Sequence, residues 1–93
     1  MIRLIREVPL PKIQDTAAQL RAAFTDNRVL SHWDSQVAAS AYLRGERMAT
    51  GDLPFFKRAK DLGLNVEFVG YGPDAVRAAA KAAAYVPKPV SVP

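Results

Sequence analysis

The sequence predicts a small α+β domain with the element order β-α-α-α-β-α, in which a two- or three-stranded sheet packs on helices and an extended tail follows. Residues 2–8 and 64–69 largely alternate apolar and polar side chains, as half-buried strands do. Between and after them, apolar residues recur at helical spacing behind helix-capping residues. A chain of 93 residues is enough for one core. We therefore expect a single compact domain over residues 1–86 and a proline-rich extended tail over residues 87–93.

The first strand is predicted over residues 2–8, where most apolar side chains lie on one side. Pro9 and Pro11 are expected to end this strand, because proline lacks the backbone donor that a sheet needs. The first helix is predicted to begin at Thr16, which has a glutamine three residues later in capping-box spacing. It is expected to end near Phe24, before a polar turn.

The second helix is predicted from about His32 to Arg47, behind a serine and an aspartate in capping spacing. Trp33, Val37 and Ala41 repeat at every fourth residue, which predicts the apolar stripe of this helix. A glycine near its end favours an earlier stop, because glycine weakens a helix interior.

The third helix is predicted to follow Asp52 as its cap, with Pro54 in its first turn and Gly63 after its last turn. The second strand follows over residues 64–69. An alanine-rich fourth helix is predicted over residues 74–86, and the prolines beyond it cannot continue a helix.

Two strands alone make a marginal sheet in water. A third strand is expected from the tail, through Val90 and Val92, or from the segment near Val29. Alternatively, two copies of the chain complete a sheet between them, so a homodimer is the expected oligomeric state.

The turn Val69–Ala75, with the sequence VGYGPDA, matches the letters of the glycine fingerprint that binds dinucleotides. However, Pro73 removes a backbone donor, and Asp74 places a negative charge where a phosphate would sit. No strand follows the fourth helix to complete a nucleotide-binding unit. We interpret the stretch as a structural turn in which Asp74 caps the helix. If the turn has a function, we expect Tyr71 to carry it.

Catalytic and metal sites have little support in the sequence. There is no cysteine, and the one histidine, His32, lies between residues that fit helix caps better than a catalytic triad. Four of the nine acidic residues fall at predicted helix starts: Asp15, Asp34, Asp52 and Asp74. We therefore expect a protein that is not an enzyme and that holds no cofactor and no metal.

Positive charge is the main functional signal, because thirteen lysines and arginines against nine acids give a net charge of +4. The candidate binding residues are cations around three helices and two aromatic residues: Arg44, Arg47, Phe55, Lys57, Arg58, Lys60, Tyr71, Arg77 and Lys81. Cations that converge on one face contact phosphates, and exposed aromatic rings stack on bases or form protein interfaces. A solvated helix face uses the same cations, and Phe55 has the alternative of packing under the loop before its helix.

The sequence thus predicts a non-enzymatic, basic binding module that acts on nucleic acid or on a nucleoprotein complex. The alternative is a protein–protein inhibitor or adaptor of the type that phages and other mobile elements encode, for example an inhibitor of a host defence nuclease complex. We expect a cytoplasmic protein with no membrane partner, because the sequence has neither a signal peptide nor a long apolar run.

Overall fold

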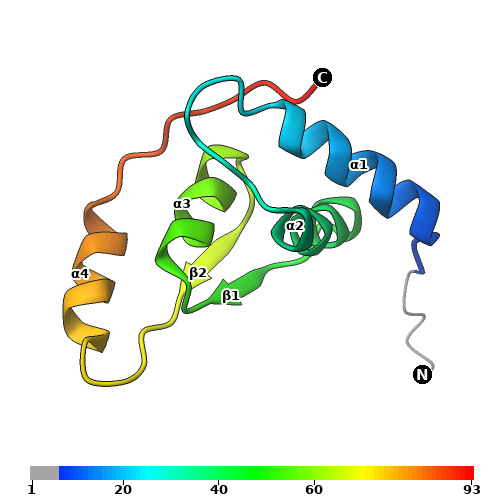
Figure 1. Cartoon of the computed structure of the whole chain (residues 1–93). Coiled ribbons are helices and arrows are strands. Elements are labelled where there is room, and N and C mark those ends of the chain that lie inside the picture. The colour runs from blue at the N-terminus through cyan, green and yellow to red at the C-terminus, as the bar shows by residue number, and fades with distance from the viewer. Residues whose placement is uncertain (1–6) are drawn as a thin grey trace, which may run out of the picture.

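The computed structural model describes residues 7–93 and confirms the α+β fold class (Figure 1). The elements of these residues are α1 (Leu10–Ala22), α2 (His32–Arg44), β1 (Met48–Thr50), α3 (Leu53–Asp61), β2 (Val66–Phe68) and α4 (Ala75–Ala84). In Figure 1, α3 lies next to the sheet, α1 and α2 lie on one side of it, and α4 lies on the other. The predicted strand over residues 2–8 falls largely outside the described residues, and Glu7 and Val8 have no regular secondary structure.

The sheet of the described residues consists of β1 and β2 in parallel, with Met48 beside Val66 and Thr50 beside Phe68. Parallel strands need a crossover connection, and α3 provides it. β2 confirms the second predicted strand. β1 was not predicted, because three residues without a clear alternation carry no strand pattern of their own.

α1 begins at Leu10, six residues before the predicted start at Thr16. The C=O of Pro9 accepts the N–H groups of Lys12 and Ile13 at 3.0 and 3.2 Å, so this proline starts the helix. Pro9 and Pro11, which we expected to end a strand, lie at the start of this helix, because the first turn of a helix needs no backbone donor. Thr16 instead lies inside the helix with 8% of its surface exposed.

α2 begins where the sequence predicts, because the Ser31 side chain accepts the Asp34 N–H at 3.1 Å. It ends at Arg44 rather than Arg47. Gly45 stops it with a φ of 65°, which lets the Glu46 N–H return to an earlier carbonyl of the helix at 3.1 Å.

The buried face of α2 differs from the predicted apolar stripe. Its buried residues are Ser35, Ala38 and Ala39, whereas Trp33 is 74% exposed and Val37 is 38% exposed. Small side chains let α2 approach α1 closely, and Ser35 accepts a hydrogen bond from the α1 residue Arg21 at 2.7 Å. The larger apolar side chains are left on the surface.

α3 has the predicted cap, since the Asp52 carboxylate accepts the Phe55 N–H at 3.1 Å. It joins two core clusters. The first cluster lies mainly among α1, α2 and α3, and contains Ala17, Leu20, Ala23, Phe24, Leu30, Ala38, Ala39, Phe55 and Leu62. The second connects α3 to β2 and α4, and contains Phe56, Ala59, Val66 and Ala82. Phe55 and Phe56 are adjacent in the helix and therefore point into different clusters.

α4 spans Ala75–Ala84, slightly less than the predicted 74–86. Asp74 is the N-cap residue as predicted, but its carboxylate makes no capping hydrogen bond. Gly72 makes the turn before the helix with a φ of 83°.

The tail beyond α4 runs back over the body toward α1 (Figure 1). Val90 and Val92 pack against the first core cluster. The N–H groups of Lys88 and Val90 donate to the side chain and the backbone C=O of Asp61 at 2.8 and 3.1 Å. The tail is therefore laid on the domain as an extended segment, and it adds no strand to the sheet.

Candidate functional site

A hollow of about 360 Å³ lies between α3, β2 and α4, and its lining includes Lys60, Phe56 and Tyr85. The Lys57 ammonium lies 5.5 Å from the centre of the Tyr85 ring, and that of Lys60 lies 5.7 Å from the centre of the Phe56 ring. An aromatic face attracts a cation without neutralising its charge. These rings therefore hold both charges beside the hollow.

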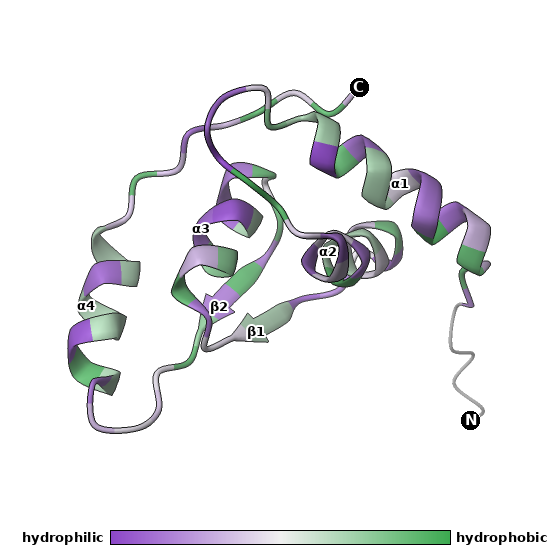
Figure 2. Ribbon diagram, in the orientation of Figure 1, coloured by the Kyte–Doolittle hydropathy of each residue, from purple (hydrophilic) through white to green (hydrophobic). Residues whose placement is uncertain are grey.

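Arg77 and Lys81 are exposed on α4 and point away from this hollow. Ala79 and Ala83 line the hollow, and each lies two positions after one of these cations. Two positions along a helix correspond to about 200° around its axis. In Figure 2, α4 is green or pale apart from two purple bands, which are its only two hydrophilic residues. α4 thus carries an alanine face toward α3 and a basic face toward solvent.

Arg58 is used inside the fold. Its guanidinium lies 5.8 Å from the centre of the Phe24 ring, and its Nε lies 3.4 Å from the Asp61 carboxylate. Its side chain is only 18% exposed, so we assign this predicted binding residue a structural role.

Asp61 is the centre of a buried polar cluster. Its Oδ1 accepts the Tyr85 hydroxyl at 2.6 Å and the Lys88 N–H at 2.8 Å, and its Oδ2 accepts from Arg28 Nη1 at 3.1 Å. Burial and the hydrogen bond to Asp61 raise the pKa of the Tyr85 phenol. Arg28 also donates to the C=O of Lys88 at 2.7 Å. The cluster holds the tail, the loop before α2 and the end of α3 together, so its chemistry serves the fold.

Asp26 provides a test of this cluster by pH. Hydrogen bonds from Arg28 lower the Asp26 pKa from its ordinary 3.8 to about 2. A lowered pKa means that Asp26 stabilises the fold above about pH 4, and that this stabilisation is lost as the pH falls toward 2. We expect the difference in melting temperature between wild type and Asp26→Asn to shrink over this interval. Thermal unfolding followed at several pH values measures it, and a constant difference would contradict the assignment.

Arg44 and Arg47 lie apart from the α3–α4 hollow. Arg47 Nη2 bonds to the Glu67 carboxylate at 2.7 Å, and both side chains are more than half exposed. Arg44 is half-buried at the end of α2, and within residues 7–93 its buried Nε has no hydrogen-bond partner. The structure therefore does not bring all predicted cations onto one face.

The two predicted aromatic residues have opposite environments. Phe55 is 6% exposed and belongs to the first core cluster, so its ring is buried and does not face a partner. Tyr71 is 79% exposed, and its ring lies over Gly51 so closely that a Cβ atom on that glycine would have no room. Of the two, Tyr71 alone presents its ring to solvent.

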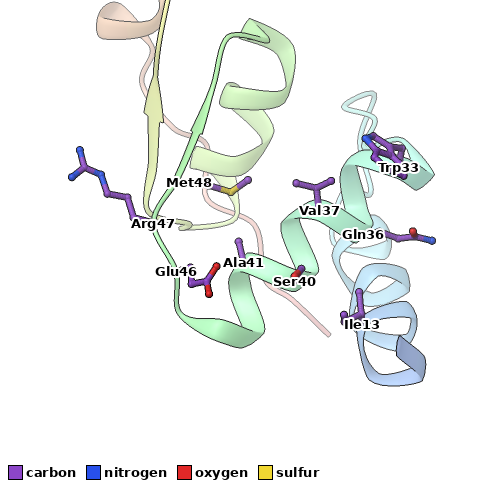
Figure 3. Close-up of a pocket in the computed structure, with 9 residues that line it drawn as sticks. All are labelled: Ile13, Trp33, Gln36, Val37, Ser40, Ala41, Glu46, Arg47 and Met48. Carbon is purple, nitrogen blue, oxygen red and sulfur yellow. The ribbon is translucent and has the colours of Figure 1, made fainter. Parts of the chain in front are cut away.

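A second hollow, of about 410 Å³, is more apolar and was not predicted. It lies between α1, α2 and the start of β1, and Figure 3 shows Met48 and Val37 pointing toward one another across it. Trp33 lies at one end of the hollow. The α2 residues of the hollow repeat at the spacing of a core-facing stripe, so the sequence pattern did not indicate that they are exposed. We call this hollow, with Ile13, Trp33, Val37, Ala41 and Met48, the Trp33 groove.

Comparisons of the chain with protein-family models, with curated proteins and with solved structures find no match. Within residues 7–93, no three histidine, aspartate or glutamate side chains gather as metal ligands do. None of the described helices has both the length and the apolar character that crossing a membrane requires.

Proposed function

We propose that the protein is a non-enzymatic binding module that contacts the phosphates of nucleic acid through α3, α4 and the start of the tail. The observation that carries the proposal is a set of cations without carboxylate partners. In the described part of the chain, the ion pairs involve Arg28, Arg47 and Arg58. The remaining cations of this region are Lys57, Lys60, Arg77, Lys81 and Lys88.

The charge of the chain is concentrated in this region. Residues 53–88 contain six cations and three acids, so they carry +3 of the net charge of +4. Asp61 and Glu67, two of those acids, are already paired with arginines. Free cations release the counterions of a nucleic-acid backbone when they bind it, and this supplies affinity without reading sequence.

The salt dependence of binding tests the proposal. Fluorescence anisotropy of a short labelled duplex is measured between about 50 and 200 mM salt, where each phosphate contact contributes about 0.9 to the slope of log K against log salt. We expect Lys57→Gln and Arg77→Gln each to lower this slope by about 0.9. Lys12→Gln removes the same charge from α1 and is the matched control, for which we expect no change in slope.

Equal effects of all three substitutions would show that net charge alone drives binding. Failure of the duplex and of a single strand to bind at low salt would remove nucleic acid as the partner. The alternative, an inhibitor or adaptor that places the same cations on an acidic protein surface, would then take its place. A pull-down from nuclease-treated lysate tests that alternative, because a stoichiometric protein partner must survive the treatment.

A further inference from the structure

Among residues 7–93, one edge of the strand β1 is unpaired. The strand bonds to β2 through Met48, whose N–H donates to Asn65 at 2.9 Å, and through Thr50, whose C=O accepts from Val69 at 2.9 Å. Alternate residues of a strand direct their backbone groups to opposite edges. The N–H and C=O of Ala49 therefore point away from β2, and among the described residues no hydrogen bond between segments involves them.

The Trp33 groove lies beside this open edge. Met48 belongs to both, since its backbone is in β1 and its side chain lines the groove. An exposed strand edge accepts another strand, and an exposed tryptophan beside it adds apolar area that binding can bury. Two short strands also form only a marginal sheet. The edge and the groove together form one surface suited to a strand from another molecule.

We propose that this surface binds a second copy of the chain, through antiparallel pairing of two β1 strands about a two-fold axis at Ala49. Each Ala49 then exchanges both of its free hydrogen bonds with the partner's Ala49. The result is a four-stranded sheet with the order β2-β1-β1-β2. A two-fold dimer presents the same patch on both copies, which is the commonest symmetry of soluble oligomers.

The register about Ala49 determines which side chains meet. Met48 stands opposite the partner's Thr50, and residues directly opposite one another point to the same face of a sheet. Because Met48 lines the Trp33 groove, the partner's Thr50 is directed into that groove. The dimer therefore covers the groove as well as the strand edge.

The opposite face of the sheet supplies electrostatic complementarity that favours a second copy as the occupant. Arg47 stands opposite the partner's Gly51 in this register. The Tyr71 ring lies over Gly51, in the place that a side chain at this position would take. The Arg47 guanidinium bonds to Glu67 of its own chain at 2.7 Å, but 66% of its side chain is exposed. Its exposed face is thus placed to meet the ring of the partner's Tyr71, and the symmetry makes this cation–π contact twice.

The substitution Ala49→Pro tests the pairing without removing a bond between β1 and β2, because the N–H that it deletes points to the open edge. Light scattering over a concentration series measures the mass. We expect wild type to weigh twice the chain mass of 10.2 kDa and Ala49→Pro to weigh that mass once. Ala49→Ser retains the N–H and is the matched control, which should remain a dimer.

The fluorescence of Trp33, the only tryptophan, gives a second readout. Its emission should shift to the red when the wild-type dimer is diluted, and should be red-shifted in Ala49→Pro at every concentration. Arg47→Ala and Tyr71→Ala should each weaken the dimer about two- to thirty-fold, with no further loss when the two are combined.

Wild type that remains monomeric at millimolar concentration would overturn the proposal. So would an Ala49→Pro protein that dimerises as tightly as wild type, once circular dichroism shows that it is folded. Binding of the labelled duplex is measured separately, and dimer formation does not depend on its outcome.

Discussion

Replacing Asp61 with alanine is expected to destabilise the fold by about 3 to 5 kcal/mol, the usual cost of removing one partner from a buried charged cluster. A chain of 93 residues has a stability of roughly 5 to 14 kcal/mol. The substitution therefore removes a large share of it. At about 4 to 8 °C for each kcal/mol, the melting temperature should fall by more than 10 °C.

The size of this effect follows from the number of groups that share one carboxylate. Asp61 is 2% exposed, and its oxygens face two arginines, a phenol and a backbone N–H. Removing the carboxylate leaves Arg58 without its ion-pair partner and leaves Arg28 with Asp26 alone. It also deprives the Tyr85 hydroxyl and the Lys88 N–H of their acceptor, and buried donors without acceptors are costly.

Thermal and denaturant unfolding measure this loss, and Tyr85→Phe is the graded control. It removes one hydrogen bond and leaves the charges paired, so we expect a cost of about 1 kcal/mol. The tail should also loosen at Lys88 in Asp61→Ala, because the Lys88 N–H loses its carboxylate acceptor, whereas the Val90 N–H keeps the backbone C=O of residue 61. Proteolysis of the tail reports this loosening. A loss no greater than that of Tyr85→Phe would show that the charges of the cluster are solvated.

Local signals in the sequence predicted the helices best where a cap was involved. Ser31 and Asp52 accept hydrogen bonds from backbone N–H groups three residues later, and this interaction depends only on neighbours in the chain. The start of α1 was missed because a proline can either end a strand or begin a helix. The outcome depends on whether α1 finds a surface to pack against, which no short stretch of sequence encodes.

β1 and the Trp33 groove were missed because both depend on tertiary structure. β1 is a strand because α3 returns the chain so that β2 lies beside it. The stripe that contains Trp33 has the spacing of a core face, yet Ala38 and Ala39 form the buried side of α2. When two neighbouring faces of a helix could each be buried, the face that the partner helix can approach more closely becomes the buried one.

The sequence identified the cations of the candidate site, but it did not show which of them are free to bind a partner. Arg58 and Lys60 are two positions apart in α3, and one pairs with Asp61 whereas the other lies over Phe56. The buried Asp61 makes the difference, and its burial depends on the tail that crosses it. Net charge alone predicts a preference for acidic partners. Which cations are free to bind such a partner can be seen only from the folded structure.

Replacing Phe55 with alanine is expected to cost about 3 to 5 kcal/mol of stability, as removal of a buried aromatic side chain does. Phe55 was a candidate contact for bases or for a protein partner. Phe55 is instead buried in the first core cluster, with 6% of its surface exposed. Its replacement should therefore destabilise the fold without removing a direct contact to a partner. An interface residue would show the reverse, with stability within about 0.5 kcal/mol of wild type.

Tyr71→Ala is the matched control, because it removes an aromatic ring that is 79% exposed. We expect it to change the free energy of unfolding far less than Phe55→Ala, although both remove one ring. Phe55→Leu should recover most of the lost stability, because leucine refills most of the cavity with apolar atoms. Denaturant unfolding compares the three variants at equal concentration. If Phe55→Ala and Tyr71→Ala were equally stable, the first core cluster would not depend on Phe55, and this residue would again be a candidate for partner contact.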